Sequence, residues 1–298
     1  MGTTTGSAVR DDTVGSAIAG AARQLEALGI ENARLEAEVL VADAFVVDRA
    51  HLLARLREPL PPPAAARFEG LLARRLRREP LAYITGTREF YGIDISCGPG
   101  ALIPRPESEL LVEIAVAEIR CRPREALWIA DIGTGTGAVA IAIATHAPSA
   151  RVVGVDREPA ALAIARQNVH ALGLASRIAL LRGDLLSGVG VVDIVVGNLP
   201  YVRDGDWRSL APEIRDNEPR EALVGGARGV EVIERLLERA PAHLAPGGLL
   251  ALESGDGQAA AVSAAARRVM PAADISVQRD LAGRDRVLVA RPAVEETA

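Results

Sequence analysis

A glycine-rich turn between two apolar segments constrains this chain more than any other feature. Residues 127–130 have the length and apolarity of a buried strand, residues 133–137 read Gly-Thr-Gly-Thr-Gly, and residues 138–144 have a helical composition. Glycines at a sharp strand-to-helix turn let a ligand approach the backbone and meet the amides of the helix N-terminus. The turn therefore predicts an α/β fold with a small-molecule site, although a GxGxG pattern alone does not identify the ligand.

Short apolar segments alternate with helical patterns through the rest of the second half of the chain. We expect strands at residues 127–130, 151–155, 178–181, 192–196, 249–253 and 287–290. The patterns at 160–172 and 230–244 are helical. Alternation of this kind is typical of a doubly wound α/β sheet.

The first part of the chain has a different pattern. From Thr13 to about Pro80, apolar residues recur at helical spacing, which predicts a small bundle of four or five helices. Between Ala82 and Ile95, β-branched and aromatic residues with glycine punctuation predict a short hairpin, and the prolines of segment 103–106 predict a stiff extended link. We expect three parts, namely a helical domain at 1–81, a hairpin and linker at 82–104, and an α/β domain at 105–298.

Composition argues against several classes of function. Apolar runs are far shorter than the roughly 20 residues that span a bilayer, and the first residues carry no apolar signal segment, so we expect a cytoplasmic protein that binds no membrane. The formal charge of −5 gives no general attraction for nucleic acid, and no direct binding to it is expected. Cys97 and Cys121 lie near no histidine at ligand spacing, and we expect no metal site. We expect a monomer.

Polar residues follow the next two predicted strands. Asp156 lies about 20 residues beyond the glycine turn, where a carboxylate can accept hydrogen bonds from both ribose hydroxyls. Asp184 and Leu185 follow the next strand and suit the edge and the face of an adenine; taken singly, Asp156 could cap a helix and Asp184 could be a turn residue. NAD is the rival ligand, but the spacing is not GxGxxG and Asp131 precedes the first glycine. The series resembles class I methyltransferases, which use S-adenosylmethionine.

The strand at 192–196 leads into a segment that suits a planar acceptor, Asn198-Leu199-Pro200-Tyr201. The side-chain oxygen of Asn198 and the carbonyl of Leu199 can accept hydrogen bonds from an NH₂ group and fix its nitrogen in line with a methyl donor. Pro200 stiffens the loop, and Tyr201 offers a flat face. This pattern predicts methylation of an amide or an exocyclic amine.

The same segment resembles the NPPY motif of enzymes that methylate glutamine amides or adenine amines. Leu199 stands where that motif has its first proline, and the NLPY form is similar to the rRNA adenine dimethyltransferases. The motif by itself therefore leaves amide and adenine acceptors open.

Further motifs resemble the PrmC/HemK family of protein-(glutamine-N5) methyltransferases over nearly the whole chain. They lie at residues 80–92, 102–109, 217–229, 253–258 and 280–286. The resemblance implies a class I, Rossmann-like sheet of seven strands with an N-terminal helical bundle and a linking β-hairpin. It also implies that the bundle helps to dock a peptide chain release factor, whose Gly-Gly-Gln loop places its glutamine amide beside residues 198–201.

The resemblance also assigns the cofactor site. S-adenosylmethionine would be held by the following residues: Gly133, Thr134, Gly135, Thr136, Gly137, Asp156, Asp184, Leu185 and Asn198, with Phe90 and Arg105 as walls. Phe90 could equally belong to the hairpin core, and Arg105 could instead pair with Glu107 or Glu109. Glu218 and Arg286 are expected to be architectural.

Three alternatives to a release factor enzyme remain open at this point. The chain could methylate the adenine N6 of a nucleic acid, or it could be a member of this family repurposed to another amide or amine acceptor. It could also be a binding module that retains the cofactor without transferring a methyl group, a reading that only Leu199 favours.

Overall fold

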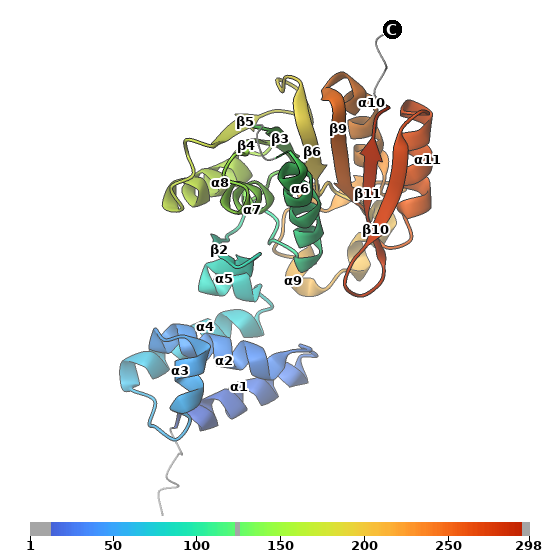
Figure 1. Cartoon of the computed structure of the whole chain (residues 1–298). Coiled ribbons are helices and arrows are strands. Elements are labelled where there is room, and N and C mark those ends of the chain that lie inside the picture. Colours follow the sequence, from blue (N-terminus) through green and yellow to red (C-terminus); the bar gives the residue numbers. More distant parts are fainter. Residues whose placement is uncertain (1–12, 123–125, 294–298) are drawn as a thin grey trace, which may run out of the picture. The chain divides into compact units, whose positions relative to one another are not determined.

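The computed structural model describes residues 13–122 and 126–293 of the chain. It divides into two compact units, residues 1–85 and residues 86–298 (Figure 1). Each unit has its own hydrophobic core. No helix in the described ranges is long and apolar enough to cross a membrane.

The first unit is a bundle of helices, as the spacing of apolar residues predicts. Its helices are α1 (Val14–Ala27), α2 (Ala33–Phe45), α3 (Arg49–Ala54), α4 (Pro62–Leu76) and α5 (Leu81–Thr85). The Thr13 hydroxyl accepts a hydrogen bond from the Ser16 amide, and the Ser16 hydroxyl accepts one from the Thr13 amide. This reciprocal pair is a capping box at the start of α1. Ile18, Leu25 and Leu40 are fully buried where α1 and α2 pack together.

A cluster of basic residues on α4 pairs within this unit. Arg75 is buried and donates to Glu36 at 2.5 Å, whereas Arg74 donates to Glu79 and to the carbonyls of Tyr83 and Ile84. These bonds fasten α4 to α2 and α5. The expectation of a hairpin from residue 82 was wrong in its first part, because residues 81–85 form helix α5 and cap the bundle core with Ile84.

The second unit begins with a hairpin, followed by a mixed sheet of seven strands in the order β10-β11-β9-β6-β3-β4-β5. The hairpin strands are β1 (Thr87–Phe90) and β2 (Ile93–Ser96). The sheet strands are β3 (Trp128–Ile132), β4 (Arg151–Asp156), β5 (Ile178–Arg182), β6 (Val192–Gly197), β9 (Leu244–Glu253), β10 (Asp274–Arg279) and β11 (Asp285–Arg291). The predicted sheet of seven strands is therefore confirmed.

Helices cover both faces of this sheet (Figure 1). One face packs on α6 (Glu109–Cys121), α7 (Ala138–His146) and α8 (Pro159–Ala171); the other packs on α10 (Glu231–Arg239) and α11 (Ala259–Val269). Alternate strand residues feed the two cores, as Ile129 and Ala130 on β3 illustrate. Burial on both faces explains why the central strands are continuous apolar runs.

The remaining elements are short and lie in the connections, most of them in the long segment 198–230 between β6 and α10. They are η1 (Pro106–Ser108), β7 (Val202–Arg203), η2 (Asp204–Ser209), α9 (Pro212–Arg215), η3 (Arg220–Ala222), β8 (Val224–Gly226) and η4 (Ala240–Ala242). The helix expected at 230–244 ends at Arg239. Pro241 has no amide hydrogen for an α-helical bond, and the chain tightens into η4 before β9 starts at Leu244.

The order of the strands determines where a ligand can bind. The chain runs outward from β3 through β4 to β5 and then returns to place β6 on the other side of β3. A crevice opens at such a switch point, at the carboxyl ends of the strands. Because Ile132 at the end of β3 is paired with Gly197 at the end of β6, the glycine turn and the segment that starts at Asn198 leave the sheet side by side.

Candidate functional site

The glycine turn between β3 and α7 has a backbone that glycine alone adopts readily. Gly133, Gly135 and Gly137 have φ angles of 73°, 56° and 82°. The turn also has little space for side chains, since a Cβ at Gly133 would lie 3.3 Å from Leu199 Cδ2. The predicted turn is therefore present. The amides of Gly133 and Thr134 donate to the Val155 carbonyl and that of Gly137 donates to the Thr134 carbonyl, so the turn is braced by its own backbone.

Asp131 holds this turn from inside the protein. It accepts hydrogen bonds from the Thr134 hydroxyl at 2.6 Å and from the Ala140 amide at 3.2 Å. Burial raises the pKa of Asp131 to about 6, and these two bonds oppose the shift. The Thr134 hydroxyl thus points toward Asp131, and the Thr136 carbonyl accepts from the buried Asn168 amide, so both threonines secure the loop.

Asp156 lies at the end of β4, beside the turn. Its carboxylate accepts from the Gly135 amide at 3.0 Å and from the Glu158 amide at 2.9 Å. Burial raises the pKa of this carboxyl, and the bonds to backbone amides oppose the shift. Each oxygen accepts one bond in this arrangement and can accept a second, as binding to a pair of ribose hydroxyls would require.

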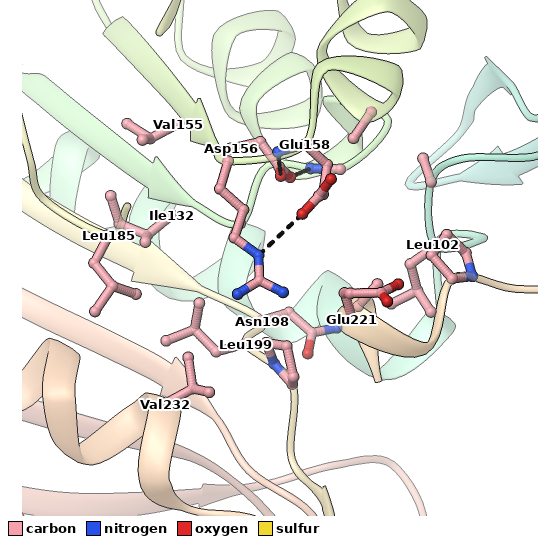
Figure 2. A pocket seen from close by; sticks show the side chains of 18 of the residues that line it. Leu102, Ile132, Val155, Asp156, Glu158, Leu185, Asn198, Leu199, Glu221 and Val232 are labelled. Carbon is pink, nitrogen blue, oxygen red and sulfur yellow. Dashed lines mark hydrogen bonds and ion pairs between the residues drawn. The ribbon is translucent and has the colours of Figure 1, made fainter. Parts of the chain in front are cut away.

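The larger of two adjoining hollows lies over these residues and takes in about 820 Å³ of empty space, open solvent at its mouth included (Figure 2). Its apolar walls include Ile132, Val155, Leu185 and Val232, and Asp156, Glu158 and Glu221 add carboxylates. Arg157 Nε pairs with Glu158 Oε1 at 3.2 Å. A hollow with apolar walls and a few carboxylates in its lining suits a nucleoside.

The predicted pair Asp184 and Leu185 lines the same hollow, but the two side chains have different surroundings. Leu185 is buried and has a left-handed backbone with φ 55°, a conformation that costs a non-glycine residue about 1 kcal/mol. The Asp184 carboxylate pairs with Arg235 at 2.5 Å and Arg239 at 3.3 Å, both on α10. Asp184 thereby fastens the Leu185 loop to α10.

A smaller hollow of about 420 Å³ adjoins the first. Phe90, Arg105 and Ser108 line it together with the glycine turn. Asn198 and Leu102 line both hollows, as do Gly133 and Gly135. Asn198 therefore lies where a ligand that spans the two hollows would pass from one to the other.

Phe90 and Arg105 both line the smaller hollow and both make contacts that stabilise the fold. Phe90 is 1% exposed within the core and still contributes to the wall of the smaller hollow. The ion pair of Arg105 is with Glu218 at 2.5 Å, so the expectation of Glu107 or Glu109 as its partner was wrong. Glu218 also accepts from the Ile103 amide at 3.0 Å, which ties the linker to the loop after α9.

Asn198 is held by a chain of hydrogen bonds that leads to the buried carboxylate of Glu253. Its Nδ2 donates to Ser108 Oγ at 2.8 Å, and Ser108 Oγ donates to Glu253 Oε2 at 2.6 Å. The Tyr201 hydroxyl donates to the other oxygen of Glu253 at 3.4 Å. Burial raises the pKa of Glu253 to about 7 and raises the pKa of Tyr201. With Nδ2 engaged, Oδ1 is the atom of the Asn198 amide that is left to accept a hydrogen bond from a ligand.

The Asn198–Tyr201 segment is fixed from behind by residues that sequence reasoning gave no role. A Cβ at Gly225 would lie 2.2 Å from the Pro200 carbonyl oxygen, and one at Gly229 would lie 2.3 Å from that of Tyr201. Gln258 donates to the Tyr201 carbonyl at 2.8 Å. The only signal in the sequence was that these residues fall within the motifs of the resemblance.

Comparisons with known proteins agree with this architecture. The family model for the PrmC N-terminal domain matches residues 16–86, and the model for a methyltransferase domain matches residues 129–217. A release factor glutamine methyltransferase of Moorella thermoacetica is 45% identical over 93% of this chain and 98% of its own length. The corresponding protein of Cereibacter sphaeroides is 41% identical over 92% of this chain and 97% of its own length.

A solved structure shares the fold at lower identity. A methyltransferase from Pyrococcus furiosus superposes with a TM-score of 0.51 and 20% identity, covering 68% of this chain and 90% of that one. At this identity the likeness supports the class I sheet and nothing finer.

Proposed function

This chain belongs to the family of release factor glutamine methyltransferases, and from that membership we propose its reaction. It transfers a methyl group from S-adenosylmethionine to the side-chain amide nitrogen (N5) of the glutamine in the Gly-Gly-Gln loop of peptide chain release factors. Curated relatives that match over nearly the full length of both chains are named release factor glutamine methyltransferases, which supports the acceptor class. We place the reaction in the cytoplasm, where release factors act.

The residues at the switch point fit S-adenosylmethionine in chemistry and in size. The larger hollow would take the nucleoside, with Asp156 on the ribose and Leu185 against the adenine. The glycine turn would face the part of the cofactor that passes toward the smaller hollow, beside Phe90 and Arg105. When bound, S-adenosylmethionine supplies an electrophilic methyl group on a sulfonium centre.

Asn198 and Tyr201 would do the work on the acceptor. An amide nitrogen is a weak nucleophile because its lone pair is delocalised, and holding it in one orientation lowers the barrier to in-line transfer. Asn198 Oδ1 and the Leu199 carbonyl would accept the two hydrogens of the acceptor NH₂, and Tyr201 would lie against its plane. No covalent bond to the enzyme is needed in this scheme.

One observation carries the proposal. Asn198 is the polar side chain that borders both hollows, and its amide is held so that its acceptor atom is available to a ligand. Leu199, the departure from the NPPY motif, has a side chain that is 3% exposed and packs with the core on the α10 face. The leucine thus keeps the backbone carbonyl and fixes the loop by packing instead of by a ring.

We assign the N-terminal unit, residues 1–85, to docking of the release factor, with residues 86–104 as hairpin and linker and 105–298 as the catalytic domain. The unit has its own core and no part in either hollow among the described residues. We propose that the chain acts as a monomer and recognises protein, without direct contacts to nucleic acid.

The test uses purified protein, labelled S-adenosylmethionine and a purified bacterial release factor. We expect label on the glutamine of the Gly-Gly-Gln loop and none in a release factor with Gln→Ala at that position. Total RNA and DNA serve as competing acceptors in the same experiment. Label in nucleic acid, or equal label in both release factors, would refute the proposal.

A further inference from the structure

Asn198 can assist the acceptor only if its amide is turned the right way. An asparagine amide has an accepting oxygen and a donating NH₂ of nearly the same shape, and its neighbours decide which of them faces the ligand. The acceptor of the proposed reaction is itself an NH₂ group. If the Asn198 NH₂ faced the acceptor, two hydrogen-bond donors would meet and no bond could form. The site therefore needs neighbouring groups that fix the orientation of the Asn198 amide.

The buried chain behind Asn198 provides such a device. Ser108 has one hydroxyl hydrogen, and an ionised carboxylate can only accept. The 2.6 Å bond between Ser108 Oγ and Glu253 Oε2 therefore uses the hydroxyl hydrogen when Glu253 is ionised. Ser108 is then left with lone pairs toward Asn198, and only the asparagine NH₂ can fill that position, at 2.8 Å.

We propose that Ser108 and Glu253 are positioning residues that set the direction of this hydrogen-bond chain, so that Asn198 Oδ1 faces the glutamine amide of the acceptor. The inference rests on the proposed function and deepens it. Ser108 is 3% exposed and Glu253 is fully buried, so the bond between these two side chains is shielded from water. The Tyr201 hydroxyl donates to the second oxygen of Glu253, and one carboxylate thus holds both ends of the acceptor segment.

Protonation of Glu253 would remove this control. A neutral carboxyl can donate its own hydrogen to Ser108 Oγ. The serine hydroxyl is then free to donate to Asn198 Oδ1, so that the Asn198 amide can adopt the flipped orientation. The charged and titratable groups that act on Glu253 are Arg286, which favours the ionised form, and Glu107, which opposes it, beside the hydrogen bond from Tyr201. Arg286 is itself held by Asp280 at 3.1 Å and donates to the Ser254 carbonyl.

The test compares variants of the full chain with a release factor and S-adenosylmethionine at saturation. Ser108→Ala breaks the chain, and Glu253→Gln introduces a donor in place of the carboxylate. We expect each to lower kcat by about tenfold or more, as loss of an oriented group in an active site does, with little change in KM. Ser108→Thr keeps the hydroxyl and should keep kcat within about twofold of the wild type.

Two readouts separate positioning from a loss of structure. Calorimetry with S-adenosylhomocysteine should give the same affinity for all variants, and Ser263→Ala, which removes a buried hydroxyl from α11, should leave kcat unchanged. In the wild type kcat should fall as the pH drops below about 7, the pKa of Glu253, whereas Glu253→Gln should lack this acid limb.

The outcomes for the two proposals differ. A wild-type chain that leaves the release factor unmethylated would overturn the proposed function and this inference with it. An active wild type together with full kcat in Ser108→Ala, or with an unchanged acid limb in Glu253→Gln, would overturn the inference alone.

Discussion

Single atoms decide how closely the Asn198–Tyr201 segment can be held. Gly225 lies so near the Pro200 carbonyl that any side chain must move that peptide. The same peptide joins the proline to Tyr201, whose carbonyl is held by Gln258. The position of the acceptor site therefore depends partly on the absence of a side chain at Gly225.

Gly225→Ala should displace this segment. Its Cβ would lie 2.2 Å from the Pro200 oxygen, a separation that can only be relieved by moving the backbone. We expect kcat for the release factor to fall by about tenfold or more, since small displacements in a site cost that much. Binding of S-adenosylhomocysteine should change little. Gly205→Ala is the matched control, because its Cβ would meet no atom within 4 Å; equal rates in the two variants would contradict the account.

Asp131 gives a pH dependence with a definite sign. Its folded pKa of about 6 lies above the ordinary value of 3.8, so the folded protein binds this proton more tightly than the unfolded chain. The stabilisation is complete below pH 3.8 and is lost as the pH rises through 6. Relative to Asp131→Asn, whose oxygen can still accept both bonds, the wild type should lose on the order of 3 kcal/mol across this window.

Urea unfolding of both proteins across this pH range gives the difference. Subtracting the free energy of unfolding of the variant from that of the wild type cancels the contributions of other titrating groups, Glu253 among them. A difference in free energy of unfolding that stays constant with pH would show that Asp131 is not shifted upward.

At the scale of helices and strands, the sequence predicted what depends on local pattern. The strand, glycine turn and helix around residue 133 are adjacent in the chain. Asp156 ends strand β4, and Asn198 comes directly after strand β6. Six apolar runs became strands of the sheet, whereas β10 lacks such a run because it is an edge strand whose residues alternate between partly buried and exposed. Helix α5 was missed because its residues favour strands and tertiary packing overrode that preference.

What the sequence could not supply is pairing across long separations. Ser108 lies 90 residues from Asn198 and 145 from Glu253, and no periodicity connects them. The same holds for Arg105 and Glu218, 113 residues apart, where the sequence favoured a neighbouring glutamate as the partner. Such contacts follow from the order of strands and from the loops between them.

Substitutions in the core of the first unit should lower its stability without affecting the cofactor site. Leu40 on α2 is fully buried in the core of that unit, whereas Leu35 on the same helix is 45% exposed. Leu40→Ala should destabilise the unit by about 2–5 kcal/mol, and Leu35→Ala by roughly 0.5 kcal/mol or less. Both should bind S-adenosylhomocysteine as the wild type does, measured by calorimetry beside thermal unfolding. Loss of that binding in Leu40→Ala alone would contradict the separation of roles.

For the whole molecule, chemistry and recognition are assigned to different units. Both hollows are lined by residues of the second unit, and the first unit has a separate core. In this assignment one chain combines a methyltransferase sheet with a separate unit for an acceptor as large as a release factor. It also makes one side chain, Asn198, the point at which cofactor and acceptor meet.

The most direct test is single-turnover methyl transfer by Asn198→Ala, with the modified release factor mapped by mass spectrometry. The account predicts that the wild type places one methyl group on the glutamine of the Gly-Gly-Gln loop. It predicts that the variant loses about a hundredfold or more in rate while its affinity for S-adenosylhomocysteine stays within about tenfold. A variant that transfers at the wild-type rate, or a methyl group found on another residue, would contradict the account.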